Sequence, residues 1–430
     1  MEACSSLSKP DEKIMKSLHK NLLSLTSLQA INYLSPFIVL PYLSHTLSMS
    51  HFGLIMYILS IISIAAIITD FGFQIYSTNW IAKNKNNKSE VAKHIGSVLL
   101  LKTIISLMVI CIINIFIFNV SMFNNTPIIE ISILLSLIVF LQIYQSPWFF
   151  QGIEEMFNIT ICVSISKITY LGLIIILVNS TNSIVNVLIS LLISTTLASA
   201  VSIYLIYKSN YEIKVPSVNI LCDTFKKSIP FFISKAFVMI YTTANTFVVG
   251  SFSGTNQTAL YSSSEKLYQA SQGVTSPLSQ VLFPYLSRTK DISIFIKYTL
   301  LLSIPVVIAC LFSYIYSIEI ITTIFGDDYS KASDTLKIFL LCTIISYFGV
   351  NFGYPAFSII DDLKYPNISV IIGGIIQLLQ VIVLVYFNMV SGENIALTIL
   401  ITESFVVTFR LFFFIKLYRK KNVKKNPENH

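Results

Sequence analysis

Residues 95–120 read IGSVLLLKTIISLMVICIINIFIFNV, and Lys102 is the one charged side chain among them. A helix needs about 20 mostly apolar residues to cross the hydrocarbon core of a bilayer. The stretch is long enough for this, and it lacks the alternation of apolar and polar residues that a barrel strand requires. It therefore predicts a transmembrane helix.

Eleven more stretches of this kind lie along the 430 residues. The other predicted spans are 21–43, 53–78, 128–150, 158–179, 184–207, 228–250, 257–286, 294–318, 335–359, 367–388 and 394–417. Hydrophobic residues make up 54% of the chain and charged residues 12%, about half the charged share of a water-soluble domain. The mean hydropathy is +0.74. The sequence predicts an all-α polytopic membrane protein with twelve transmembrane helices, and it excludes a soluble or a disordered chain.

Basic residues collect in the tails and in every second loop. They include Lys9, Lys13, Lys16, Lys20, Lys83, Lys85, Lys88, Lys93, Lys208, Lys214, Lys226, Lys227, Arg288, Lys290, Lys297, Lys364, Lys416, Arg419, Lys420 and Lys421. Since cytoplasmic loops are rich in Lys and Arg, we expect both termini in the cytoplasm. The same bias accounts for the net charge of +8, so no nucleic-acid partner is expected. The outward loop 319–334, which carries four acidic residues, is expected to be a solvated turn.

The chain divides into two halves of six predicted spans each. We expect a tail at 1–20, an N-lobe at 21–207, a linker at 208–227, a C-lobe at 228–417 and a basic tail at 418–430. Pro147-Trp148-Phe149 before Glu154-Glu155 is matched by Pro355-Ala356-Phe357 before Asp361-Asp362. Six is an even number, so the halves would form a parallel repeat with a substrate path between them. The alternative is chance likeness in a sequence rich in Ile, Ser and Asn.

Several ionisable residues lie inside predicted spans, where a charge is costly unless it pairs, faces a cavity or reaches the surface. Asp70 continues into a polar stripe, or it is a helix-end acid with a neighbouring partner. Lys102 is expected to extend to the cytoplasmic surface. Lys167 and Lys235 face a cavity or form structural ion pairs, and Lys266 lies beside the stripe described next. Trp148, near a span end, is expected to anchor the chain at the membrane interface.

Span eight is the most polar span. Its polar residues Ser262, Glu265, Gln269, Gln272 and Ser276 follow helical spacing and form one stripe. Gln29 and Asn32 give span one a similar face. Such a stripe must face protein or water. It favours a hydrated path for sugars or phosphates, while interhelical hydrogen bonding, with Glu265 paired to Lys235 or Lys266, is the alternative.

Signatures of catalysis are missing. The sequence has no G-x-x-x-x-G-K-[ST] loop, no G-x-S-x-G and no H-E-x-x-H, and its five histidines do not cluster. The six cysteines form no C-x-x-C pair and are interpreted as small apolar residues. We therefore expect a protein that is not an enzyme and that needs no cofactor or metal.

Several motifs together carry a family resemblance. They are Gln29-Ala30-Ile31-Asn32-Tyr33, Leu40-Pro41-Tyr42-Leu43-Ser44, Phe52-Gly53-Leu54, Asp70-Phe71-Gly72-Phe73, Trp148-Phe149-Phe150-Gln151-Gly152, Ser166-Lys167 and Glu265-Lys266-Leu267. With them, the chain from about 20 to 415 resembles the polysaccharide-transport-family flippases. These are the O-antigen repeat-unit (Wzx-type) translocases of the multidrug/oligosaccharidyl-lipid/polysaccharide exporter superfamily.

The resemblance implies a function. Such proteins move an undecaprenyl-diphosphate-linked oligosaccharide from the cytoplasmic to the periplasmic leaflet of the bacterial inner membrane by alternating access. It implies Lys102, Lys167, Lys235 and Lys266 as diphosphate contacts, with Gln29, Asn32, Gln269 and Gln272 on the sugars. Asp70 or Glu265 would be a coupling or structural acid, and the O-antigen polymerase and chain-length regulator would be partners. A multidrug cation antiporter and a membrane-embedded O-antigen polymerase are the alternatives.

Overall fold

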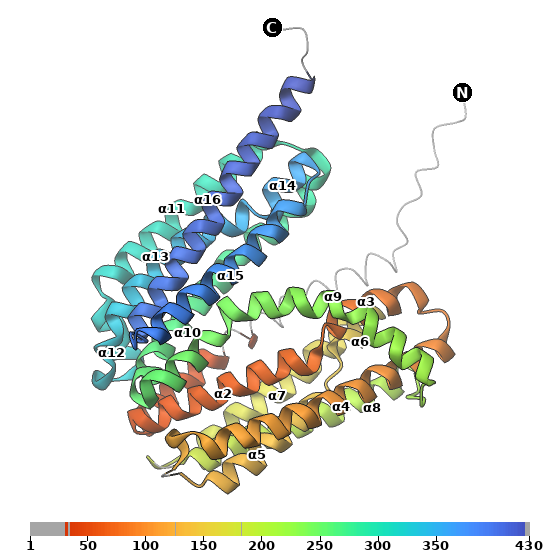
Figure 1. Ribbon diagram of the computed structural model, residues 1–430, viewed down its shortest axis with the longest axis vertical. Coiled ribbons are helices and arrows are strands. Elements are labelled where there is room, and N and C mark those ends of the chain that lie inside the picture. Colours follow the sequence, from red (N-terminus) through yellow and green to blue (C-terminus); the bar gives the residue numbers. More distant parts are fainter. Residues whose placement is uncertain (1–30, 33–34, 125, 182, 426–430) are drawn as a thin grey trace. The chain divides into compact units, whose positions relative to one another are not determined.

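The computed structural model describes residues 31–32, 35–124, 126–181 and 183–425 (Figure 1). In these residues the regular structure is helical throughout, without a strand. The α-helices are α2 (Met49–Asp70), α3 (Phe73–Asn84), α4 (Lys88–Asn119), α5 (Ile128–Gln142), α6 (Pro147–Gly152), α7 (Met156–Leu177), α8 (Ile184–Lys208), α9 (Val218–Thr242), α10 (Ala244–Thr289), α11 (Ile292–Ile315), α12 (Ser317–Phe325), α13 (Ala332–Asn351), α14 (Tyr354–Ile360), α15 (Lys364–Tyr386) and α16 (Gly392–Lys425). Two 3-10 turns, η1 (Ser121–Phe123) and η2 (Asp327–Tyr329), complete them.

Within the described part of the chain, nine helical segments are long and apolar enough to cross a membrane. The number is ten if the bent pair Val218–Ile240 and Ala244–Gly273 counts as one span. Large apolar side chains lie exposed on them, such as Ile115 on α4 and Ile315 on α11, as lipid-facing surfaces require. The protein is an all-α, multi-pass membrane protein, which confirms the predicted class. The number twelve stays a prediction, and most of the first predicted span lies outside the described residues.

The chain forms two compact units, each with its own core. Unit 1 contains 65–179 and 183–233, and unit 2 contains 40–64 and 234–425. Aromatic residues dominate the core of unit 1, where Phe73, Trp148 and Phe149 are fully buried between α3, α4, α6 and α8. The expectation that Trp148 anchors the chain at the interface is therefore wrong, because the Pro147 turn carries its ring into the core. The predicted lobe boundaries stay predictions.

Unit 2 packs around α16, the long helix drawn in dark blue, which lies along α13 and α15 (Figure 1). One core joins Tyr261 and Tyr268 of α10 to Phe339 of α13. A second core joins Phe295 of α11 and Phe357 of α14 to Phe414 of α16, among others. These two cores hold the ends and the middle of α10 in place, and α10 carries the polar stripe.

The second predicted span, 53–78, is broken rather than continuous. α2 ends at Asp70, and Phe71 and Gly72 adopt left-handed backbone angles with φ of 43° and 77°. A Cβ on Gly72 would lie 2.6 Å from the backbone nitrogen of Phe232 and 2.8 Å from the carbonyl oxygen of Ser228. Only glycine fits both the angle and the space. The break places Asp70 at the end of α2, next to α9.

Other predicted spans also break at identifiable residues. Pro147 begins the short helix α6 after α5, and Pro355 stands in the first turn of α14 after α13. A backbone N–H in the first turn has no partner within the helix, so proline costs no hydrogen bond at these positions. The loop predicted between the spans 228–250 and 257–286 is wrong, because these residues lie inside α10, where Gly254 has φ 81° and ψ 179° and kinks the helix. The two matched Pro motifs thus lie in short helices of similar setting, and the parallel repeat stays a prediction.

The loop 319–334, which the sequence predicts to face outward, is folded and is not a solvated turn. Residues 317–325 form α12, and Ile321, Phe325 and Tyr329 are buried. The rings of Phe325 and Tyr329 contact that of Phe52, with centroids 6.3 and 5.6 Å away. The prediction of a turn rested on the four acidic residues, and it overlooked the amphipathic pattern of the helix.

A cluster of charged side chains connects three helix ends in unit 2. Asp361, which follows α14, accepts hydrogen bonds from Lys290 after α10 and from Lys421 of α16. Lys290 also donates to the carbonyl of Ser358 at 2.6 Å, and Lys421 to that of Ile359 at 3.3 Å. The hydrogen bonds from Lys290 and Lys421 lower the pKa of Asp361 below its ordinary value.

We expect Asp361→Asn to lower the melting midpoint of the purified protein by roughly 2–4 °C at neutral pH, since exposed ion pairs contribute about 1 kcal/mol or less. A carboxyl whose pKa is lowered by folding stabilises the protein above its ordinary pKa of about 3.9 and loses that contribution in acid. The difference from wild type should therefore disappear as the pH falls below this value. Asp362→Asn is the control, because Asp362 only accepts from the backbone of Lys364 and asparagine caps equally well. Equal melting midpoints of wild type and Asp361→Asn at neutral pH would show that the ion pairs of Asp361 do not stabilise the protein.

Candidate functional site

Unit 1 contains a buried ion pair at the break between α2 and α3. The ammonium group of Lys102 lies 3.2 Å from Asp70 Oδ1, and the two side chains are 7% and 14% exposed. The prediction that Lys102 extends to the cytoplasmic surface is wrong. α4 begins at Lys88, so Lys102 lies about 20 Å along the helix, too deep to reach the end. The structure confirms the alternative that Asp70 pairs with a neighbour.

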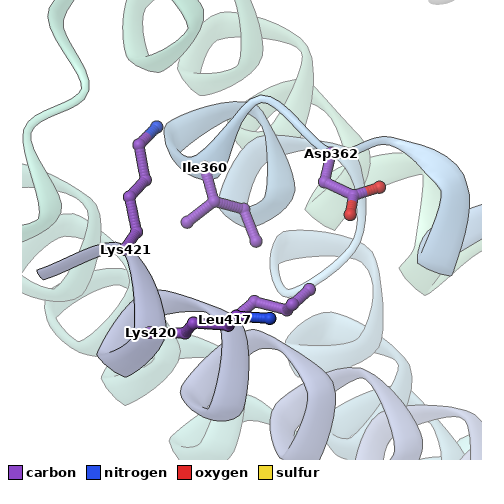
Figure 2. A pocket seen from close by; sticks show the side chains of 5 residues that line it. All are labelled: Ile360, Asp362, Leu417, Lys420 and Lys421. Carbon is purple, nitrogen blue, oxygen red and sulfur yellow. The ribbon is translucent and has the colours of Figure 1, made fainter. Parts of the chain in front are cut away.

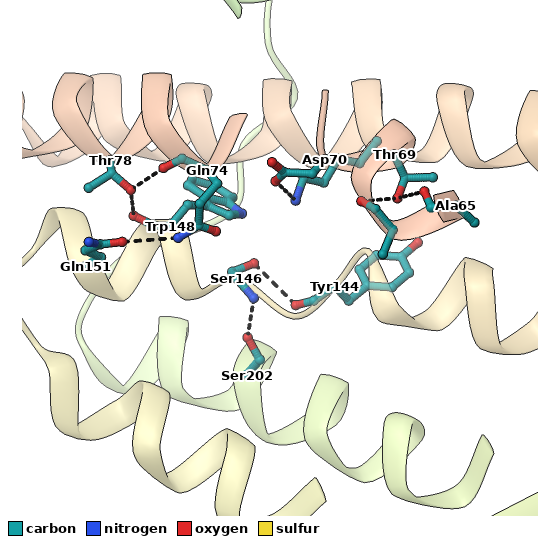
Figure 3. A network of polar contacts seen from close by, with 12 residues as sticks. Ala65, Thr69, Asp70, Gln74, Thr78, Tyr144, Ser146, Trp148, Gln151 and Ser202 are labelled. Carbon is teal, nitrogen blue, oxygen red and sulfur yellow. Dashed lines mark hydrogen bonds and ion pairs between the residues drawn. The ribbon is translucent and has the colours of Figure 1, made fainter. Parts of the chain in front are cut away.

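A polar network surrounds this break (Figure 3). Gln74 of α3 donates to Gln151 of α6 at 3.1 Å, and the Thr78 hydroxyl donates to the carbonyl of Trp148 at 3.0 Å. The backbone of Ser146 donates to Ser202 of α8 at 3.0 Å. The motif at 148–152 therefore joins α6 to α3, and the residues before it join the turn to α8. These residues position the helices around Asp70.

Unit 2 contains the polar stripe of α10. Glu265 is 4% exposed, and its carboxylate accepts hydrogen bonds from Thr246 at 2.7 Å and Tyr261 at 3.4 Å. Lys266 donates to Gln269 at 3.0 Å. The carboxylate is thus held by two hydroxyl groups on α10 itself, on either side of the Gly254 kink.

A small cavity lies beside this carboxylate, with a volume of about 60 Å³. It is lined by Met56, Leu59, Ser60, Ser63, Thr243, Thr246, Ser262, Glu265, Lys266 and Gln269. Such a volume holds a few water molecules. The hydroxyl of Ser262 is fully buried and has no hydrogen-bond partner among the residues that are described. A buried hydroxyl of this kind is normally satisfied by water, so the stripe borders a hydrated space.

The structure thus brings Ser262, Glu265, Lys266 and Gln269 together. Ser60 and Ser63 of α2 were missed, although their spacing of three residues in an apolar span was a signal. A buried amide network was missed too: Gln377 of α15 donates to Asn245 of α10 at 3.1 Å and to Thr398 of α16 at 2.8 Å.

The other candidate residues lie elsewhere. Lys167 of α7 and Lys235 of α9 are half-buried, in units 1 and 2 respectively. Gln272 is half-buried on α10 and Asn32 is exposed, while Gln29 lies outside the described residues. The described residues contain no group of three or more His, Cys, Asp or Glu side chains that could hold a metal ion. The binding roles of all these residues stay predictions.

The chain folds as a helical multi-pass membrane protein, and solved structures of other proteins share this fold. The lipid II flippase MurJ, in an inward closed conformation, matches with a TM-score of 0.71 at 16% identity, over 92% of this chain and 89% of MurJ. An inward-facing multidrug resistance MATE family transporter of the MOP superfamily matches with a TM-score of 0.68 at 15% identity, over 94% of this chain and 99% of its own. These likenesses establish the fold.

Sequence comparison establishes the family. The profile described as "Polysaccharide biosynthesis protein" matches residues 18–290, and the chain belongs to this family. Two curated relatives are both named "Putative O-antigen transporter". The protein from Shigella dysenteriae is 29% identical over 92% of this chain and 99% of its own length. The protein from Escherichia coli strain K12 is 24% identical over 64% of this chain and 66% of its own length.

Proposed function

We propose that this protein is a flippase that moves an undecaprenyl-diphosphate-linked oligosaccharide, an O-antigen repeat unit, from the cytoplasmic to the periplasmic leaflet. The observation that carries this proposal is the end-to-end match to the Shigella transporter. The fold shared with a lipid II flippase supports it, because that neighbour also handles a lipid-linked substrate. A transporter and not an enzyme is the function that these relatives favour.

The substrate would meet different groups at its two ends. Lysine ammonium groups bind phosphate as point charges through charge-assisted hydrogen bonds, and Lys167, Lys235 and Lys266 are proposed for the diphosphate. Asn32, Gln29, Gln269 and Gln272 offer amides to the sugars. Lys102 is a weaker candidate for the diphosphate, since its ammonium group is held by Asp70.

Alternating access needs an energy source, and we propose Glu265 as the coupling acid. Its carboxylate is nearly enclosed but borders the hydrated cavity, through which a proton or a cation would reach it. Intramembrane acids of this kind commonly serve as proton or ion carriers.

We expect Glu265→Gln to reduce transport roughly tenfold or more, a loss of about 1.4 kcal/mol or more, while the melting midpoint changes little. Glutamine retains an oxygen that accepts from Thr246, so packing is preserved while the charge is lost. The measurement is the surface polymer in cells that produce each variant at equal level. Thr246→Val is the control, because it removes a hydrogen bond but leaves the carboxylate in place. Wild-type transport by Glu265→Gln would exclude a coupling role for Glu265.

Deletion of the gene tests the function itself. We expect undecaprenyl-diphosphate-linked single repeat units to accumulate in the inner leaflet, with no surface polymer and with rescue by the wild-type gene. Loss of a polymerase would instead leave single repeats on the surface. Normal polymer with new sensitivity to cationic drugs would identify a multidrug antiporter, the candidate that the likeness to the MATE family transporter favours.

This function sets the location. We propose the bacterial inner membrane, with both termini in the cytoplasm as the distribution of Lys and Arg predicts. The O-antigen polymerase and the chain-length regulator are the proposed protein partners, because they would act on the translocated repeat unit.

A further inference from the structure

An apolar groove runs between α11 and α16 on unit 2, away from the polar stripe of α10. Its volume is about 660 Å³, within the roughly 300–1,000 Å³ that ligand sites occupy. Its lining includes Ile292, Ile296, Phe352, Phe414, Ile415 and Arg419. All but Arg419 are apolar, so the groove combines an apolar body with one cationic end.

The floor of the groove is aromatic and held in place. The rings of Phe295, Phe352 and Phe414 contact one another, with centroid distances of 5.1, 6.0 and 6.2 Å. Phe295 is fully buried and Phe414 is 4% exposed. Because the second core of unit 2 fixes these rings, they cannot move to fill the groove. An apolar ligand from outside the protein therefore has to fill it.

The groove lies at one membrane surface. Arg419 is 27 residues beyond Gly392, the first residue of α16, which corresponds to about 40 Å of helix. A bilayer measures roughly 40–45 Å with its headgroups. Arg419 therefore lies at headgroup level, and the apolar lining points along the helix into the hydrocarbon. Ile292 and Ile296 stand in the first turns of α11, at the same level.

Arg419 is available for a ligand. It is exposed, and among the described residues it takes part in no hydrogen bond or ion pair. Its neighbours differ, since Lys290 and Lys421 are held by Asp361. Figure 2 shows Lys420 and Lys421 leaving α16 in different directions around a second pocket of about 220 Å³, with the carboxylate of Asp362 turned away from both. Arg419 is thus next to further basic residues of α16, and Asp361 is already paired with Lys290 and Lys421.

We propose that this groove is a binding site for an anionic glycerophospholipid of the surrounding bilayer. One acyl chain lies along Ile296, Phe352 and Phe414, and the phosphate group accepts hydrogen bonds from the guanidinium of Arg419. The planar guanidinium matches the geometry of phosphate oxygens, and cationic residues at this level attract anionic headgroups. This site goes beyond the proposed transport function and does not depend on it.

The test measures lipid binding to the purified, delipidated full-length protein. Native mass spectrometry with phosphatidylglycerol and phosphatidylcholine as probes gives the affinity for each lipid. We expect phosphatidylglycerol to bind about fivefold more tightly, and Arg419→Gln to reduce its affinity to that of phosphatidylcholine. Lys416→Gln removes an equal charge on the same helix from outside the groove lining, over the ring of Phe412, and should leave binding unchanged.

A second variant tests the apolar part. Ile415 is 47% exposed, so Ile415→Trp should fill the groove without disturbing the core and should weaken both lipids. Melting midpoints confirm that each variant is folded. Equal affinity of the wild type for both lipids, or equal losses for Lys416→Gln and Arg419→Gln, would overturn the proposal. Displacement of phosphatidylglycerol by inorganic phosphate at similar concentration would also overturn it, since the ligand would then be free phosphate.

Discussion

Gly53→Ala is expected to lower the stability of the protein by several kcal/mol and to abolish transport. A Cβ on Gly53 would lie 1.9 Å from the carbonyl oxygen of Thr255 and 3.1 Å from the backbone nitrogen of Ala259. The first of these distances is far inside van der Waals contact, and both atoms belong to backbone that cannot rotate away. The added methyl group must therefore push α2 and α10 apart, and overpacking of this kind costs at least about 1–3 kcal/mol.

The damage spreads because this contact holds further interactions. Next to Gly53, the hydroxyls of Ser50 and Thr255 lie 2.9 Å apart, and those of Tyr57 and Ser251 lie 2.8 Å apart. The ring of Tyr57 stacks on Phe247 with a centroid distance of 5.5 Å. Small residues allow helix backbones to approach closely inside a bilayer. When α2 and α10 separate, the distances in all three interactions increase. Ser60 and Ser63, which line one side of the Glu265 cavity, then move away from α10.

The measurement is the melting midpoint of the purified variant together with surface polymer in cells. Gly172→Ala is the matched control, because no atom lies within 4 Å of the added Cβ and alanine favours a helix by up to about 1 kcal/mol. It should melt at or above the wild-type midpoint. A Gly53→Ala protein with the same melting midpoint as the wild type would show that α2 and α10 do not pack as closely as the structure has them.

The sequence predicts the class of this fold because apolar length and charge distribution are local properties. Residues 95–120 identify a span without any neighbour. The breaks within spans are a different matter. Gly72 adopts a left-handed conformation because α9 approaches it, and Gly254 kinks α10. The approach of α9 to Gly72 cannot be inferred from the flanking residues, so a continuous helix was predicted at 53–78. At Gly254 a loop was predicted between the spans 228–250 and 257–286, whereas the structure has one kinked helix.

The candidate site was predictable to a similar degree. The stripe of Ser262, Glu265 and Gln269 follows from helical spacing, and the cavity beside it agrees with that pattern. The partner of a charge does not follow from spacing. Asp70 and Lys102 are 32 residues apart in two helices, and only the position at which α4 begins decides whether Lys102 reaches the surface or Asp70. The contribution of α2 to the cavity likewise depends on packing between distant segments.

We expect Asp70→Leu and Lys102→Met, each made alone, to destabilise the protein by about 3–5 kcal/mol. Each change removes one charge of a buried pair, so the remaining charge loses its ion-pair partner in a largely buried position. The pair is 3.2 Å long and less than one sixth exposed at either side chain, so solvent screens it little. Melting midpoints of the two purified variants should fall to similar extents. A small change in either would mean that water reaches the remaining charge.

The double variant Asp70→Leu with Lys102→Met separates a structural role from a transport role. Apolar residues of similar volume often replace a buried ion pair at no cost in stability, so we expect the melting midpoint to return close to the wild-type value. If the pair only fixes the break between α2 and α3, surface polymer returns with it, and this is the result that the geometry favours. A stable double variant without polymer would contradict that result and give the pair a role in transport, either through Lys102 at the diphosphate or through Asp70 as the coupling acid that the family resemblance implies. Single variants cannot make this distinction, because in them a loss of transport follows from the loss of stability alone.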